Sequence, residues 1–327
     1  MKSISKILLL ATIAATITIY SCKKEENTAT PATSATPETF SSIIDFQNRY
    51  GQQPVAHTIN GTTGGSFTTA QGTIVSVPPN AFVTAGSIPV TGNVIISFED
   101  IYKKSDMLLS NKVTMTMWGT PLNSGGEFFM KATENGNAVT LASGKIITVE
   151  QPVALTGGIA DTTMTAFTVA DSMGLGLGAG AGQNADWVPQ PFDTINFIGN
   201  GSYMYSFYQF QNPPQNGTWS NCDNPYPFSS LPQTNLTLHT ADSTDNIELY
   251  LVFSNINSVI HIYQYSSNFI YPYAPVGLQC TAVAITTRNG NLFSSFTPIT
   301  ISNNMTVNFT LTQTTSSAFI TQLNALN

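Results

Sequence analysis

Residues 61–82, GTTGGSFTTAQGTIVSVPPNAF, indicate how the first half of this chain folds. Within them, residues 72–77 largely alternate between polar and apolar side chains, with glycines before them and the turn residues Pro78, Pro79 and Asn80 after them. A period of two between glycine and proline residues is typical of a β-strand with one buried face. The stretch therefore predicts a strand that is bounded by a turn at each end.

The same period of two continues along the rest of the chain. It marks residues 92–102, 112–119, 126–133, 144–153 and 164–170 in the first half, and residues 202–210, 235–239, 247–253, 258–265, 279–287 and 305–312 in the second. Helical periodicity is almost absent, and we expect one short helix in residues 40–50, before Gly51 and Pro54. The spacing of the strands predicts an all-β chain with two tandem domains that resemble antiparallel β-sandwiches.

Three features of residues 61–82 resemble the β domain that netrin receptors, ankyrins and tight-junction scaffolds share. They are the pair Gly64-Gly65, the strand 72–77 and the turn 78–82, in which Asn80 replaces the usual Gly. Asparagine tolerates the left-handed backbone conformation that such a turn needs. The resemblance covers about residues 55–170 and implies a structural or docking module, because relatives of this domain are not catalytic.

Further stretches resemble uncharacterised surface lipoproteins of the Bacteroidota. Residues 101–115 and 122–133 resemble a version of the same β domain in those proteins, and residues 216–228 resemble a Trp-x-Asn-Cys-Asp signature found in them. No activity is attached to that signature, so the resemblance indicates a class of protein and not a reaction.

The N-terminal residues predict a secretory signal peptide in residues 1–21. Lys2 and Lys6 precede an apolar run of fourteen residues, 7–20. This run is shorter than the roughly 20 residues that a helix needs to span a bilayer. Residues 19–22 resemble the lipobox of bacterial lipoproteins, which implies cleavage before Cys22 and its acylation. The acyl chains would anchor the protein in a membrane. The alternative is an ordinary signal peptide whose cleavage site lies beside a cysteine.

Four charged residues follow Cys22 directly: Lys23, Lys24, Glu25 and Glu26. They resemble the short charged tract that directs lipoproteins of the Bacteroidota to the outer face of the outer membrane. The resemblance implies display at the cell surface, whereas the alternative is the start of a linker with accidental charge.

The remaining sequence divides into a tether, two domains and a hinge. Residues 22–41 are rich in Thr, Ala, Pro and Ser and predict an extended, lipidated tether. We expect the first β-sandwich domain in 42–173, a flexible glycine-rich hinge in 174–185 and the second domain in 186–327. The hinge has no Lys-Ser or Lys-Thr pair and no expected helix behind it, so it is not a phosphate-binding loop.

The charge of the chain argues against nucleic acid as a partner. Removal of the signal peptide leaves nine basic and eighteen acidic side chains, a net charge of −9. Only 9% of all residues are charged, against about 25% in ordinary soluble domains. A surface solvated by hydroxyl and amide groups, as in extracellular β proteins, is therefore expected.

The sequence predicts no enzyme, cofactor or metal site. His57, His239 and His261 are far apart, and no histidine or cysteine pair has the spacing of metal ligands. Three acidic residues lack a recognisable calcium-binding loop and are expected at a solvated strand end and loop: Glu99, Asp100 and Asp106. An enzyme would need two carboxylates from distant strands that face each other in a cleft.

Cys222 and Cys280 are the cysteines that remain if Cys22 is acylated. In the oxidising surroundings of a secreted protein they are predicted to form a disulfide. The alternative is two buried free thiols, which the strand-like residues around Cys280 favour.

Four tripeptides resemble the O-glycosylation signal of exported Bacteroidota proteins, in which Asp is followed by Ser or Thr and then by an apolar residue or Thr. Their hydroxyl residues are Thr162, Ser172, Thr194 and Ser243. The alternative is turn chemistry, in which an Asp side chain accepts hydrogen bonds from the residues that follow it.

Aromatic residues are abundant in the second half, and most are expected in the core. Tyr271 and Tyr273, in NFIYPYAP, are candidates for stacking on sugar rings. The sequence predicts a non-enzymatic lipoprotein, held at the outer membrane by acyl chains, with a structural, adhesive or protein-docking role toward a surface protein or extracellular polymer. The alternative is a glycan-binding lipoprotein that assists an outer-membrane transporter.

Overall fold

The computed structural model describes residues 38–157, 161–169, 186–198, 200–208, 217–225 and 231–327. The predicted signal peptide, most of the tether and the predicted hinge lie outside these residues. Strands make up most of the regular structure in the described part, which confirms the predicted all-β class.

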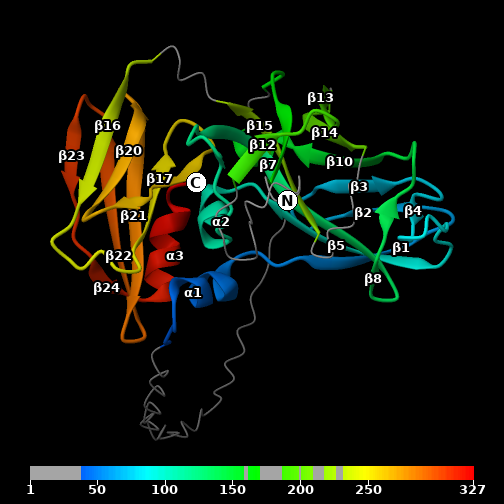
Figure 1. Cartoon of the computed structure of the whole chain (residues 1–327), viewed down its shortest axis with the longest axis horizontal. Helices are drawn as coiled ribbons and strands as arrows, with labels where there is room; N and C mark the ends of the chain where they lie inside the picture. The colour runs from blue at the N-terminus through cyan, green and yellow to red at the C-terminus, as the bar shows by residue number, and fades with distance from the viewer. Residues whose placement is uncertain (1–37, 158–160, 170–185, 199, 209–216, 226–230) are drawn as a thin grey trace, which may run out of the picture. The chain divides into compact units, whose positions relative to one another are not determined.

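Two sheets, here called the first sheet pair, contain most strands up to residue 225 (Figure 1). In spatial order one sheet consists of β1 (Val55–Asn60), β5 (Asn93–Ile101), β7 (Leu122–Glu134), β15 (Thr218–Pro225), β11 (Thr165–Val169), β12 (Asp186–Pro189) and β6 (Met115–Thr116), and β8 (Asn137–Ala138) pairs with β7. The other consists of β13 (Thr194–Ile198), β14 (Ser202–Phe207), β10 (Ile147–Pro152), β3 (Ile74–Val77) and β2 (Gly65–Thr68). A separate ribbon joins β4 (Phe82–Val83) to β9 (Thr140–Leu141).

Two further sheets, the second sheet pair, are built from residues 233–314. One has the order β19 (Gln264–Tyr265), β20 (Asn268–Pro275), β16 (Gln233–His239) and β23 (Met305–Asn308). The other has the order β18 (Val259–His261), β17 (Glu248–Phe253), β21 (Gln279–Arg288), β22 (Asn291–Thr300) and β24 (Thr312–Thr314). Strand pairing in the described residues is antiparallel apart from β6 with β12 and β16 with β23.

The stretch 61–82 folds as its sequence predicts. Strands β2 and β3 form an antiparallel pair in which Gly65 lies opposite Val77. Gly64 has a φ of 67°, and a Cβ atom there would overlap the carbonyl oxygen of Val77. Asn80 has a φ of 53°, so the left-handed conformation expected of it is confirmed.

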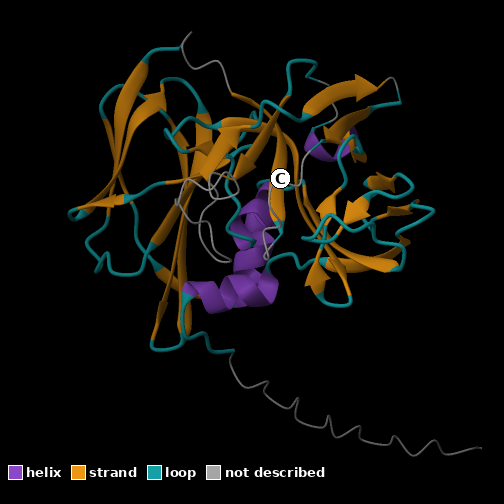
Figure 2. Cartoon of the chain, turned by 45° about the vertical axis from the view of Figure 1, so that its right-hand side comes forward, coloured by secondary structure: helices purple, strands orange, loops and turns teal. Residues whose placement is uncertain are grey.

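Three helices lie among the sheets (purple in Figure 2). The expected helix is confirmed as α1 (Ile43–Tyr50), whose N-cap Ser42 accepts a hydrogen bond from the backbone N–H of Asp45. Two others, α2 (Lys104–Leu109) and α3 (Ser316–Asn324), and the single-turn 3-10 helix η1 (Val153–Thr156) were not expected.

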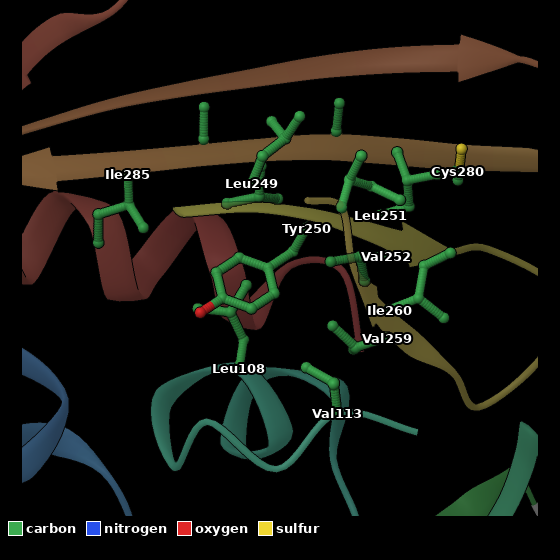
Figure 3. Close-up of a cluster of buried hydrophobic side chains, with 14 of the residues drawn as sticks. Leu108, Val113, Leu249, Tyr250, Leu251, Val252, Val259, Ile260, Cys280 and Ile285 are labelled. Carbon is green, nitrogen blue, oxygen red and sulfur yellow. The ribbon is translucent and has the colours of Figure 1, made fainter. Parts of the chain in front are cut away.

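Each sheet pair encloses its own main hydrophobic cluster. Side chains such as Val75, Phe98, Phe128 and Tyr205 fill the first. The second contains residues of β16, β17, β20, β21 and β22 together with buried residues of all three helices. Figure 3 shows Tyr250 of β17 pointing toward Leu108 of α2, with Val113 nearby. The chain between β5 and β6 therefore packs into the core of the second sheet pair.

The predicted boundary between the domains differs from the division that the sheets make. Strands β12, β14 and β15 pair with strands of the first half, β13 pairs with β14, and the second sheet pair begins at β16. In addition, α1 contributes Ile43 and Phe46 to the core of the second sheet pair. Strand alternation gives no information about which distant strand is the partner, and the expected start of the second domain at residue 186 therefore differs from the division that the sheets make. Residues 38–327 form one compact unit.

Candidate functional site

A pocket of about 670 Å³, here called the polar pocket, opens between the two sheet pairs. The first sheet pair and its loops contribute most of its lining, and the loop between β17 and β18 and Asn327, after α3, contribute the rest. The lining residues are Tyr102, Lys103, Lys104, Asn123, Leu155, Thr156, Gly157, Asp161, Thr162, Ser254, Asn255, Ile256, Asn257 and Asn327. Hydroxyl, amide and charged groups dominate this set, so the pocket suits a polar ligand.

Asn257 fixes the position of the loop between β17 and β18. Its Nδ2 donates to the carbonyl oxygens of Tyr102 at 3.0 Å and Ser124 at 2.9 Å, and its backbone N–H donates to Oδ1 of Asn123 at 3.1 Å. The backbone N–H of Ser124 donates in return to the carbonyl oxygen of Asn257 at 3.0 Å. Four hydrogen bonds thus join the two walls of the polar pocket.

The charged residues of the polar pocket differ in how they are held. Lys104 is buried, its Nζ donates to the carbonyl oxygen of Phe253 at 2.8 Å, and burial lowers its pKa. Lys103 is exposed. Asp161 accepts hydrogen bonds from Thr163 and Asn224, which outweigh the opposing effect of partial burial and lower its pKa.

Several polar groups of the polar pocket keep free hydrogen-bonding capacity. Among the described residues, the side chains of Lys103 and Asn255, the Oδ1 of Asn257 and the Nδ2 of Asn123 have no hydrogen-bond partner. The site therefore offers one cation and both amide donors and amide acceptors. Ligand hydroxyl groups, which donate and accept, match such a mixture.

A buried acid cluster, formed by Glu99, Glu127, Asp223 and the cation Lys112, lies on β5, β7, β15 and the chain after α2. Glu127 lies opposite Asn221, whose Nδ2 donates to Oδ2 of Asp223 at 2.6 Å. Glu127 and Asp223 are both 0% exposed. Within the described part of the chain, neither carboxylate oxygen of Glu127 and only one of Asp223 has a hydrogen-bond partner.

Burial governs the protonation of the buried acid cluster. Desolvation, together with the neighbouring charge of Asp223, raises the pKa of Glu127 well above its usual value. Desolvation likewise raises the pKa of Glu99 to about 7 and raises that of Asp223. Because Glu127 and Asp223 have no exposed surface, a substrate does not reach this pair of acids.

The three acids expected at a solvated strand end lie elsewhere, and that expectation is wrong. Glu99 and Asp100 are each 7% exposed, and Asp100 accepts hydrogen bonds from Thr69 and Thr73 at 2.7 and 2.5 Å. Asp106 is half-buried and bonded to Gln52. The reason is that the last residues of β5 are buried on both faces of the strand. The His, Cys, Asp and Glu residues of the described ranges form no group of three that would hold a metal ion.

The histidines lie on different sheets and make no common site. His57 on β1 stacks on Phe67, with ring centroids 3.8 Å apart, and His239 on β16 bonds to Asn268. His261 on β18 is buried, and its Nε2 lies 2.6 Å from Oε2 of Glu248.

The predicted disulfide is absent, which corrects that expectation. Cys222 on β15 and Cys280 on β21 are both buried free thiols. Cys222 packs with Val153, Met164 and Tyr203, whereas Cys280 belongs to the core of the second sheet pair. The structure therefore agrees with the alternative, two buried free thiols.

The two tyrosines proposed for sugar stacking differ in exposure. Tyr271 is 4% exposed and its hydroxyl donates to the carbonyl oxygen of Gly119, so its ring is not available for stacking. Tyr273 is 57% exposed, because β20 changes register against β16 between the two residues. Neither lines the polar pocket.

Three of the predicted glycosylation residues lie on the surface of the described chain. Thr162, Thr194 and Ser243 are exposed. Asp161 also accepts hydrogen bonds from Thr163 in its own turn, so the alternative of turn chemistry applies to it. The Asp242 side chain accepts instead from Thr240, Arg288 and Leu311, none of which follows it directly. Ser172, Cys22 and the residues Lys23, Lys24, Glu25 and Glu26 lie outside the described residues. No helix in the described part is long and apolar enough to span a membrane.

Sequence reasoning missed Lys103, Asn255 and Asn257 as site residues. The run of Ser and Asn in residues 254–258 signals a loop between two strands, but not its position against β7. Comparison with known proteins adds no assignment: neither the family models nor the curated proteins that were searched match this chain.

Proposed function

We propose that this chain is a non-enzymatic lipoprotein of the outer bacterial surface that binds an extracellular glycan. The observation that carries the proposal is the polar pocket, whose free amide groups and cation lie on two walls joined by Asn257. A preformed pocket of this volume holds small ligands without a large ordering cost. Leu155 and Ile256 add apolar surface for the carbon-bound faces of a sugar ring.

Replacing Asn255 by alanine tests the polar pocket. Asn255 is exposed and has no hydrogen-bond partner among the described residues, so the fold should be unaffected. Loss of its amide is expected to weaken glycan binding about tenfold, the effect of one or two hydrogen bonds. Saccharide arrays with the full-length protein in detergent identify the glycan, and calorimetry then compares the variants. Asn48→Ala, on the exposed face of α1, is the control.

The result that contradicts this site is a glycan that binds the Asn255→Ala variant and the parent equally. Failure of every saccharide on the array to bind the parent contradicts the proposed function itself.

Lipid anchoring is the second part of the proposal, and Cys22→Ala tests it. This variant is expected to appear as soluble or unprocessed protein, because the acyl chains would be lost. Replacement of the charged residues 23–26 by neutral ones should leave the protein in the membrane but protect it from protease added to intact cells. Equal protease sensitivity of this variant and the parent would show that the charges do not direct export.

Protein docking is a second candidate function, and exposed aromatic residues favour it. Tyr263, Tyr265 and Tyr273 are 53%, 74% and 57% exposed near or on strands β18 to β20. Tyrosine is enriched at protein interfaces. Crosslinking from Tyr265 on intact cells would separate this function from glycan binding.

A further inference from the structure

We propose that the polar pocket selects saccharides that carry carboxylate groups, uronic acids, and that Lys103 binds the carboxylate. The inference rests on the proposed function, because it names the class of glycan that the pocket takes. Its basis is the distribution of charge in the lining. Lys103 and Lys104 contribute two of the eleven basic residues of a chain that has eighteen acidic ones.

Lys103 is the cation that is available to a ligand. Its side chain is exposed and makes no hydrogen bond or ion pair with a described residue, and the acid whose charge it influences, Asp106, does not line the polar pocket. The neighbouring Lys104 does not compete, since its Nζ already donates to Phe253 at 2.8 Å. An ammonium group that no protein carboxylate contacts directly can bind a carboxylate of a ligand, and the resulting hydrogen bond is charge-assisted.

Asp161 is the acidic residue of the lining, and its carboxylate is already occupied. Oδ1 accepts from the backbone N–H and the hydroxyl of Thr163, at 2.8 and 2.5 Å, and Oδ2 accepts from Nδ2 of Asn224 at 2.8 Å. These bonds hold the carboxylate against its own turn, so it does not form an ion pair with Lys103.

The rest of the lining suits the neutral part of a uronic acid. The Asn255 side chain, Oδ1 of Asn257 and Nδ2 of Asn123 supply donors and acceptors for hydroxyl groups. A small inorganic anion would leave these amides unused in a pocket of about 670 Å³. An acidic peptide offers carboxylates but few hydroxyl groups, so it matches the lining less well.

The test compares one sugar with and without its charge. Calorimetry measures the binding of an oligogalacturonate and of its methyl ester to the full-length protein in detergent. We expect the parent to bind the free acid at least about tenfold more tightly than the ester, the usual effect of a charge-assisted hydrogen bond. Lys103→Gln should reduce binding of the acid to the level of the ester, and added salt should weaken only the parent with the acid.

Lys145→Gln is the matched control, because it makes the same charge change at a lysine that does not line the polar pocket. It should bind the acid as the parent does. Equal binding of acid and ester, equal binding by parent and Lys103→Gln, or stronger binding of polyglutamate than of the oligogalacturonate would each overturn the inference. Binding of neutral saccharides alone would overturn it and leave the proposed function intact, whereas no binding of any saccharide would reject both.

Discussion

Replacing Phe46 by alanine is expected to lower the free energy of unfolding by about 3–5 kcal/mol, the range for truncation of a buried phenylalanine. Phe46 is 0% exposed, and its ring contacts those of Phe40, Tyr50 and Phe319 at centroid distances of 5.3, 5.0 and 5.5 Å. The cavity would form in the core of the second sheet pair, although residue 46 precedes every strand of the chain that is described. Urea denaturation followed by circular dichroism measures the loss.

Ile44→Ala is the matched control on the same helix. Ile44 is 51% exposed, so its truncation should change the free energy of unfolding by no more than about 0.5 kcal/mol. A loss below about 1 kcal/mol for Phe46→Ala, or equal losses for the two variants, would show that α1 does not belong to this core.

The Glu127→Gln variant is expected to be more stable than the parent at pH 8 by about 1–3 kcal/mol, and nearly as stable as the parent at pH 5. Burial and the charge of Asp223 raise the pKa of Glu127 against the smaller opposing effect of Lys112, which favours the protonated carboxyl group at pH 5, and glutamine has nearly the same shape. At pH 8 the folded parent must either ionise this buried group without a hydrogen-bond partner or keep it protonated at a pH at which the unfolded chain would ionise it. The amide avoids both costs.

The sign of the pH dependence follows from the raised pKa values. A carboxyl group whose pKa is higher in the folded state binds more protons there, so stability falls as the pH rises from its unfolded pKa through its folded pKa. For Glu99 this window runs from 4.5 to about 7. Asp193, with a pKa raised to about 6 by burial, acts in the same direction. The parent should therefore lose stability between pH 5 and pH 8.

The other titratable groups are the same in both proteins and do not change the difference in stability between Glu127→Gln and the parent. Four acids have lowered pKa values, Glu38, Asp45, Asp161 and Asp242, and their contribution is lost only at lower pH. The lowered pKa of His57 opposes the trend near its usual value of 6.5 but is common to parent and variant. Glu134→Gln, on the same strand as Glu127, should retain the pH dependence of the parent. An identical pH dependence for Glu127→Gln and the parent would contradict a raised pKa of Glu127 in the folded protein.

Local pattern predicted the strands well because alternation along a strand reports which side chains are buried in its own sheet. It located β3, β5, β10, β17 and β21 and the helix α1. It missed α3, although Thr315 at the N-cap and the buried pair Phe319 and Leu323, four residues apart, are signals of a helix. Their surroundings are rich in Thr, which favours strands and obscured these signals.

The candidate site was far less predictable, because it depends on contacts between distant segments. Glu127 alternates with the buried Phe128 and Met130, so a solvent-facing position was the natural expectation for it. Lys112, Glu99 and Asp223 lie near Glu127, and β7 is buried on both faces at this point. Where both faces of a strand are buried, alternation does not indicate which residues face solvent. Asn257 joins β7 across 133 residues of chain, a distance at which no motif operates.

The position of α1 also has a consequence for the order in which the chain folds. Glu38 accepts a hydrogen bond from Ser316, 278 residues away, and Phe46 packs on Phe319. During synthesis from the N-terminus, α1 is made long before α3, so the core that contains both cannot close until α3 has left the ribosome. Contacts of such long range slow folding, because the entropy of loop closure is lost before the contacts form. If the predicted signal peptide directs export, the polypeptide would thereby remain unfolded in this region, and competent to cross a membrane, until α3 has been made.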